Sequence, residues 1–197
     1  MSESPLHEKR PAFFLDRDGT ISHEVGYVNH VSRFELFPWT IEALRCLRQA
    51  GFLAVVVTNQ SGVARGYFGE ELVHEVHARL QAQLAEAGAR LDGIYYCPHH
   101  PNEGQPPYRQ ECDCRKPKPG MLYRAAQELG IDFSRSVLVS DKYEDVAMAH
   151  GLGLCAALVL TGYGRGEYEY RRHLWSRPPD VVAENLLDAV NKILNQE

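Results

Sequence analysis

The chain has 197 residues, of which 44% are hydrophobic and 24% are charged, and its formal net charge is −5 at pH 7. This composition fits one globular domain, residues 1–197, with an adequate core. The acidic balance argues against a nucleic-acid partner, which normally meets a basic surface. No apolar run reaches the roughly 18 residues of a membrane span, and residues 1–9 form a loose tail without a secretory signal. Five cysteines without such a signal indicate a reducing compartment, the cytoplasm.

Short apolar runs alternate with helical repeats along the chain. Strands are expected at 12–15, 52–57, 93–96, 136–139, 154–160 and, at a sheet edge, 181–182. Helices are expected from an N-cap at Thr40 to Gly51, and at 70–87, 119–129, 143–150 and 184–194. Between them, 97–118 is an irregular insert and 161–179 has an ambiguous period, with one helical turn around 168–173. The alternation predicts a parallel α/β sheet in three layers.

The first strand ends in the motif Asp16-Arg17-Asp18-Gly19-Thr20. Open α/β sheets bind ligands at the carboxyl ends of their strands, and there two carboxylates one residue apart can face one pocket. Their mutual repulsion favours a bound cation, and their oxygens suit Mg²⁺. A D-x-D pair alone is more often an acidic turn. The full motif after an apolar strand is more specific and predicts a site.

Polar residues follow two further strands. Thr58 and Asn59 end the second strand, and the turn that continues through Gln60 and Ser61 offers a hydroxyl and backbone N–H groups for phosphate oxygens. Asp141 follows the fourth strand. Taken singly, these are ordinary turns or helix N-terminal acids, but matching strand ends converge in space.

Lys116 lies in the proline-stiffened stretch Arg115-Lys116-Pro117-Lys118-Pro119, directly before a helix. A lysine held in this way supplies a fixed point charge for phosphate. The alternative is a solvated basic loop. Two histidines on the longest helix, His74 and His77, have the spacing of a metal pair, but without a third ligand nearby we expect solvated helix residues.

In their order and strand-end positions these motifs resemble the haloacid dehalogenase (HAD) superfamily of phosphatases over residues 12–160. The resemblance implies a HAD-like (Rossmann-like) fold in which Asp16 forms an aspartyl-phosphate and Asp18 is the acid/base. It also implies that Mg²⁺ is held by Asp16, the Asp18 carbonyl and Asp141. Thr58 and Lys116 would then offset charge on the transferring phosphoryl group, and Asp145 would support Lys116 or the metal shell.

The sequence departs from this family at one position. Many members have Gly directly before the last motif's Asp, where this chain has Ser140. If the position requires a positive φ, Ser would be strained there, and the metal geometry would change.

Cys97, His99, Cys112 and Cys114 form a C-x-H and C-x-C pattern that offers four soft ligands. Four such ligands suit a closed, structural Zn²⁺ site, which leaves no open position for catalysis. The rival to His99 is His100, and the alternative to zinc is a loop with free cysteines. A redox role has less support because there is no C-x-x-C.

The zinc-loop sequence narrows the resemblance to bacterial heptose bisphosphate phosphatases, which remove the 7-phosphate and supply lipopolysaccharide-core precursors. By this resemblance there is no large cap domain, and Arg115 reads a phosphorylated sugar with help from Lys142 and the flap residues Glu24 and Tyr27. The protein is expected to be a monomer. Two rivals stay open: a histidinol-phosphate phosphatase, which shares the zinc loop, and a non-catalytic zinc-loop module that binds nucleic acid or protein.

Overall fold

The computed structural model describes residues 9–195, so the expected tail over residues 1–9 lies outside the described part except for Lys9. All strand pairings in the central six-stranded sheet are parallel, and the strand order is β3-β2-β1-β4-β5-β6. The strands are β1 (Ala12–Leu15), β2 (Leu53–Asn59), β3 (Gly93–Cys97), β4 (Val137–Ser140), β5 (Cys155–Val159) and β6 (Val181–Ala183). The predicted parallel α/β sheet is therefore confirmed.

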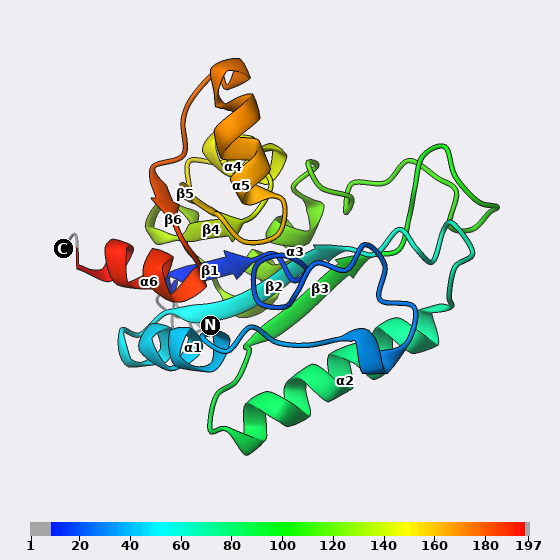
Figure 1. The fold of residues 1–197 in the computed structure, drawn as a ribbon, viewed down its shortest axis with the longest axis horizontal. Coiled ribbons are helices and arrows are strands. Elements are labelled where there is room, and N and C mark those ends of the chain that lie inside the picture. Colours follow the sequence, from blue (N-terminus) through cyan, green and yellow to red (C-terminus); the bar gives the residue numbers. More distant parts are fainter. Residues whose placement is uncertain (1–8, 196–197) are drawn as a thin grey trace, which may run out of the picture.

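The central strand β1 lies between β2 and β4, with Phe14 opposite both Val55 and Leu138 (Figure 1). From β1 the chain builds outward through β2 and β3, and then crosses back to build β4, β5 and β6 on the other side. The strand order thus reverses between β1 and β4. In open α/β sheets the crevice at such a reversal is where ligands bind, so the fold places Asp16 and Asp141 at that point.

Helices cover both faces of the sheet and complete three layers. They are α1 (Thr40–Gln49), α2 (Glu70–Glu86), α3 (Gly120–Leu129), α4 (Tyr143–Gly151), the single turn α5 (Gly164–Gly166) and α6 (Leu186–Leu194). Apolar side chains of α1, α2 and α6 pack on one face, and those of α3 and α4 pack on the other. Short 3-10 turns span 31–33, 133–135 and 172–174, and a π turn spans 167–171.

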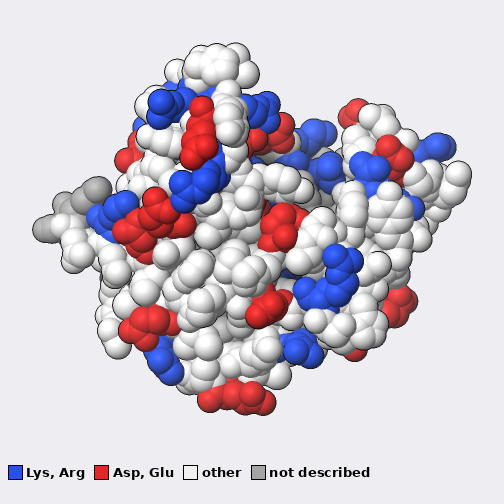
Figure 2. Space-filling model, in the orientation of Figure 1, with Lys and Arg blue, Asp and Glu red and all other residues white. Residues whose placement is uncertain are grey.

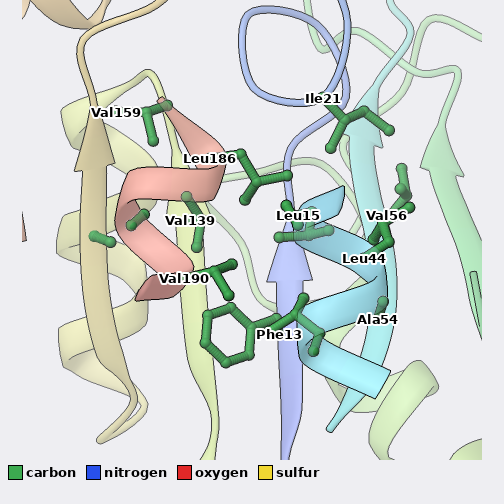
Figure 3. Close-up of a cluster of buried hydrophobic side chains, with 14 of the residues drawn as sticks. Phe13, Leu15, Ile21, Leu44, Ala54, Val56, Val139, Val159, Leu186 and Val190 are labelled. Carbon is green, nitrogen blue, oxygen red and sulfur yellow. The ribbon is translucent and has the colours of Figure 1, made fainter. Parts of the chain in front are cut away.

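Successive side chains of β1 enter opposite cores, which is why its whole run is apolar. Phe13 and Leu15 meet Leu44 of α1 and Leu186 of α6 (Figure 3), whereas Phe14 belongs to the opposite cluster. All four residues of β1 are fully buried. This burial fixes the strand whose end carries the two aspartates.

Three local expectations differ from the structure. Thr40 is the first residue of α1 and not its N-cap, because its buried hydroxyl donates to the carbonyl oxygen of Ile21 at 2.7 Å. His77 is buried, at 8% exposure, and is not a solvated helix residue, whereas His74 is exposed as expected. The ambiguous segment is helical over 164–174, longer than the single turn expected around 168–173.

The connections that flank the site carry no added domain. Between β1 and β2 the structure has only a 3-10 turn and α1, so no large cap covers the sheet end. Between β3 and α3 the chain is irregular, as expected, and it projects beyond the end of β3 (Figure 1). Figure 2 shows basic and acidic side chains interspersed on the visible face. Among residues 9–195, no helix has both the length and the apolar character of a bilayer span.

Candidate active site

The carboxyl ends of the strands open into a cavity of about 330 Å³. Most of the predicted site residues line it. They are Asp16, Asp18, Glu24, Tyr27, Thr58, Asn59, Ser61, Arg115, Lys116 and Lys142, and they are joined there by Gly26, Glu144, Asp145 and Tyr163. The structure therefore brings together residues that are up to 147 positions apart in the sequence, from Asp16 to Tyr163, at the point where the strand order reverses.

Asp16 is buried between two lysines. Lys116 Nζ lies 3.0 Å from its Oδ1, and Lys142 Nζ lies 3.7 Å from its Oδ2. The backbone N–H of Arg17 also donates to Oδ1 at 2.8 Å. Burial alone would raise the pKa of Asp16, but the charges of Lys116 and Lys142 outweigh it and lower the pKa. Asp16 is therefore an ionised carboxylate, the state that a carboxylate nucleophile requires.

Lys116 is held from both ends. Its Nζ lies 2.6 Å from Asp145 Oδ2, and its backbone N–H and carbonyl both bond the Asn59 side-chain amide, at 3.1 and 3.0 Å. Burial alone would lower the pKa of Lys116, but Asp145 and Asp16 outweigh it and raise the pKa. Asp145 thus supports Lys116, and Lys116 stays a cation in the cavity wall.

Ser140 adopts its position without backbone strain, since none of the described non-glycine residues has a positive φ. It is the last residue of β4 and is fully buried. Its hydroxyl donates to Asp145 Oδ2 at 2.8 Å and accepts the backbone N–H of Lys142 at 3.1 Å. The serine therefore adds a hydrogen bond to the pair formed by Asp145 and Lys116.

Asp141 fits a cation site. It is fully buried, its Oδ2 accepts the N–H of Tyr163 at 2.9 Å, and its Oδ1 has no hydrogen-bond partner among the described residues. A Cβ on Gly19 or Gly162 would lie 2.1 or 2.2 Å from its Oδ2, so both glycines allow the carboxylate to lie against the β1 loop. Burial and then the charge of Asp16 raise the pKa of Asp141 to about 7. An unpaired carboxylate oxygen beside a second carboxylate is the donor set that Mg²⁺ prefers.

Gln60 is not among the residues that line the cavity, and its predicted contact with the substrate stays a prediction. Its side chain is buried, and its amide Nε2 donates to Thr58 Oγ1 at 2.9 Å and to Asp18 Oδ2 at 3.0 Å. Gln60 therefore lies behind the cavity wall and positions residues that face the cavity.

The flap residues meet the cavity from the segment after β1. Glu24 Oε1 accepts the backbone N–H of Gly26, and the ring of Tyr27 packs edge-on against Tyr67 at 4.8 Å between centroids. Burial and then the charge of Asp18 raise the pKa of Glu24. Tyr27 is 38% exposed, so its hydroxyphenyl group is accessible at the cavity mouth.

Cys97, His99, Cys112 and Cys114 form a compact cluster whose ligand atoms all lie within 4.8 Å of one another. The closest contacts are 3.1 Å between Cys114 and Cys97 Sγ and 3.3 Å between Cys114 and Cys112 Sγ, and Cys114 Sγ lies 3.4 Å from His99 Nδ1. The sulfurs are too far apart for a disulfide, which needs ~2.05 Å, and the cysteines are free. Four ligand atoms around a tetrahedral zinc lie roughly 3.5–3.8 Å apart, so the donor set and spacing fit that ion.

His100 takes no part in this cluster. Its Nδ1 accepts the backbone N–H groups of Asn102 and Glu103, at 3.2 and 3.1 Å, and its Nε2 lies 3.3 Å from Arg65. Of the two rival histidines, the structure therefore places only His99 in the cluster.

Arg115 links the cluster to the cavity. It follows Cys114 directly, its Nη1 donates to the carbonyl oxygen of His99 at 3.1 Å, and it lines the cavity wall next to Lys116. Any ion that fixes Cys114 and His99 thus fixes the backbone on both sides of the Arg115 contact.

Sequence reasoning missed Tyr163. It follows β5, its N–H bonds Asp141, and Lys142 Nζ lies 5.5 Å from its ring centroid. The signal was present, because Thr161, Gly162 and Tyr163 follow an apolar strand as Asp16 and Asp141 do. Thr161 Oγ1 donates to the carbonyl oxygen of Gly19 at 2.6 Å, which joins this loop to the β1 loop.

Comparisons with known proteins agree with this geometry. A family model described as HAD-hydrolase-like matches residues 113–189. The chain is 49% identical over 154 residues to the D-glycero-beta-D-manno-heptose-1,7-bisphosphate 7-phosphatase of Pasteurella multocida, over 78% of this chain and 83% of the relative. Identity is also 49% over 154 residues with the enzyme of that name from Escherichia coli K12, over 77% and 80% of the two chains.

Among solved structures, a D,D-heptose 1,7-bisphosphate phosphatase from B. bronchiseptica, complexed with magnesium and phosphate, is 31% identical to the chain. It superposes with a TM-score of 0.81 over 95% of this chain and 99% of that one. Identity and coverage at these levels establish common family, and the chain therefore belongs to the heptose-1,7-bisphosphate 7-phosphatase family of HAD-like phosphatases.

Proposed function

We propose that this protein is a Mg²⁺-dependent phosphatase that removes the 7-phosphate of D-glycero-β-D-manno-heptose 1,7-bisphosphate through an aspartyl-phosphate. The observation that carries the proposal is the position of Asp16, an ionised carboxylate between Lys116 and Lys142 at the carboxyl end of β1. The names of the relatives support the sugar bisphosphate and its β anomer.

In the first step an Asp16 carboxylate oxygen attacks phosphorus, and the bond from phosphorus to the C7 oxygen breaks. The leaving oxygen keeps the electron pair of the broken bond and takes a proton from Asp18. In the second step a water molecule gives a proton to Asp18 and attacks phosphorus, which releases phosphate and restores Asp16. Lys116 offsets the charge on the phosphoryl oxygens throughout.

Asp16, the Asp18 carbonyl and Asp141 would hold Mg²⁺, and the unpartnered Asp141 oxygen supports this assignment. When bound, the ion neutralises charge on the phosphate so that an anionic nucleophile can approach it. The magnesium in the B. bronchiseptica complex belongs to that protein and is consistent with this reading.

Cys97, His99, Cys112 and Cys114 would bind one zinc ion with a structural role, because four protein ligands leave no open position. The role follows from the Arg115 contact with the His99 carbonyl. In this proposal zinc keeps Arg115 at the cavity rim, where it binds the non-reacting end of the sugar together with Lys142, Glu24 and Tyr27.

The test is phosphate release from a panel of substrates at matched Mg²⁺ concentrations. We expect the highest kcat/KM for the β-anomer of the heptose 1,7-bisphosphate, with lower values for the α-anomer, sugar monophosphates and histidinol phosphate. A preference for histidinol phosphate would replace the heptose assignment. The absence of Mg²⁺-dependent turnover on every ester would contradict the phosphatase proposal itself.

A further inference from the structure

The Asp18 carboxylate accepts hydrogen bonds from two buried side chains, Arg17 and Gln60. Arg17 Nε donates to Oδ1 at 3.0 Å and Arg17 Nη2 donates to Oδ2 at 2.8 Å, a bidentate pair. Gln60 Nε2 donates to Oδ2 at 3.0 Å. The orientation of Asp18 in the cavity therefore depends on where the Arg17 guanidinium lies.

Arg17 is itself held deep in the protein, at 1% exposure, between the sheet and α2. Its Nη2 also donates to Gln60 Oε1 at 3.0 Å, and its carbon Cζ lies 5.8 Å from the Phe34 ring centroid. Its remaining nitrogen, Nη1, lies 3.2 Å from Nε2 of His77 on α2. A buried guanidinium N–H that loses its acceptor carries a desolvation cost, so a change at His77 should move Arg17.

His77 is suited to accept this hydrogen bond. Burial, followed by the charges of Arg17 and His74, lowers the pKa of His77 to about 3, so the ring is neutral near pH 7. Its ring packs edge-on against Tyr96, with 5.6 Å between centroids. With the imidazole fixed in place, Nε2 can act as the acceptor and Arg17 Nη1 as the donor.

We infer that His77 is a positioning residue for the phosphatase reaction, acting through Arg17 to aim the Asp18 carboxyl group at the leaving oxygen. The inference rests on the proposed function, in which Asp18 donates the proton to that oxygen. Among the described residues His77 forms its hydrogen bond with Arg17, and neither residue lines the cavity, so its contribution would reach the substrate through Arg17 and Asp18.

A misplaced Asp18 should matter only where the leaving group needs a proton. A sugar alkoxide is a poor leaving group and depends on protonation, whereas p-nitrophenolate leaves without it. A general structural defect would lower activity on both kinds of ester alike. The ratio of the two losses therefore separates positioning from packing.

The experiment compares wild-type protein with His77→Leu, which removes the acceptor, and His77→Gln, which keeps one on a side chain of good helix propensity. We expect His77→Leu to lower kcat/KM for heptose bisphosphate by roughly tenfold and that for p-nitrophenyl phosphate by less than about twofold, a fraction of the usual general-acid contribution. His77→Gln should recover most of the loss. His74→Ala, on the exposed side of the same helix, should match wild type.

Equal losses on both esters, no loss on either, or no recovery in His77→Gln would overturn the inference. If His77→Leu does not fold, His77→Ala makes the same comparison. A wrong substrate assignment can be told apart from a wrong role for His77, because the wild type would then prefer another sugar phosphate. The loss of kcat/KM in His77→Leu would be measured on that ester and compared with the loss on p-nitrophenyl phosphate.

Discussion

Asp16 is the residue on which the proposed chemistry depends, and its two lysine contacts make its substitution informative. Asp16→Asn keeps the shape but replaces an anionic oxygen nucleophile with a weakly nucleophilic amide that is also a poorer Mg²⁺ ligand. We expect turnover to fall by ~10³-fold or more, while the circular dichroism spectrum stays that of wild type, because Lys116 keeps its partner Asp145. Substantial Mg²⁺-dependent turnover by folded Asp16→Asn would contradict the nucleophile assignment.

Ser140 tests whether Lys116 needs support beyond Asp145. Ser140→Ala removes the hydrogen bond to Asp145 Oδ2, and we expect kcat/KM to fall by roughly fivefold, the equivalent of ~1 kcal/mol. The matched control is Ser136→Ala, since Ser136 is also buried and its hydroxyl bonds Ala12 N–H at the opposite end of the strand. That variant should lose stability, measured by urea unfolding, but not kcat/KM. A similar kinetic loss in both variants would show that Ser140 acts only through the fold.

Arg115 tests how the non-reacting end of the substrate is read. Arg115→Ala should lower kcat/KM for the heptose bisphosphate by roughly 10- to 100-fold, the loss of one charge-assisted contact of ~1.5–3 kcal/mol. Heptose 7-phosphate lacks the second phosphate and should lose much less. Arg115→Lys should restore only part of the loss because an ammonium group cannot form two parallel N–H bonds. An equal loss on both substrates would mean that Arg115 serves the reacting phosphate or the fold.

At the scale of elements, the irregular segment between β3 and α3 is the part that depends most on a metal. It contains few residues of either hydrophobic core, so its conformation needs another constraint. The cluster of Cys97, His99, Cys112 and Cys114 joins the end of β3 to the start of the Arg115–Lys116 stretch. Zinc would thus connect a segment with little core of its own to the cavity wall.

Metal analysis should find about one zinc per chain, as one Cys₃His site requires. Cys112→Ser should lower the zinc content and raise KM more than it lowers kcat, because Arg115 would lose its fixed position. Cys46→Ser is the matched control, since Cys46 lies half-buried on α1, outside the cluster. Stoichiometric zinc in Cys112→Ser, or zinc-free wild-type protein with full activity, would argue against the site.

The elements that carry the site could be predicted because buried strand positions are apolar, whereas the site residues at the strand ends are polar. β1 is apolar throughout and is followed by Asp16, whereas β2 and β4 are apolar until they end in polar residues, so both the strand and its active end can be predicted from the sequence. The segment after β5 gave a weaker signal, because its short α, π and 3-10 turns over 164–174 have no single period.

Side-chain partners in the second layer of contacts were harder to predict. Gln60 looked like part of a phosphate-binding turn, yet it points inward to Asp18 and Thr58. His77 occupies a position four residues after Val73 and three before Leu80, both buried. Its helical period therefore marked a core-facing position, but its polar character suggested solvent. Only the three-dimensional placement of Arg17 explains a buried histidine there.

At the scale of the whole molecule, the parallel sheet and its two hydrophobic cores follow from pattern alone, because α/β alternation allows few other arrangements. The electrostatics of the cores do not follow in this way. Arg17, Lys116, Asp141 and Asp145 are all nearly or fully buried, and their charges offset one another only after strands distant in sequence are brought together.

The buried His77 gives the whole molecule a predictable acid sensitivity. Its pKa in the folded protein is about 3, below the usual 6.5 of an unfolded chain, so as the pH falls below 6.5 the unfolded state binds a proton that the folded state does not. The free energy of unfolding should therefore decrease towards acid, by at most ~1.4 kcal/mol per pH unit between pH 6.5 and about 3.

We expect urea unfolding of wild type to show this slope between pH 6.5 and 4.5. His77→Gln has no titrating group at the position and should show a shallower slope, whereas His173→Gln, at an exposed position in the 3-10 turn over 172–174, should follow wild type. All three proteins have the same carboxylates, so the difference between slopes reports on His77. Parallel slopes for wild type and His77→Gln would show that the ring is protonated without cost in the folded state.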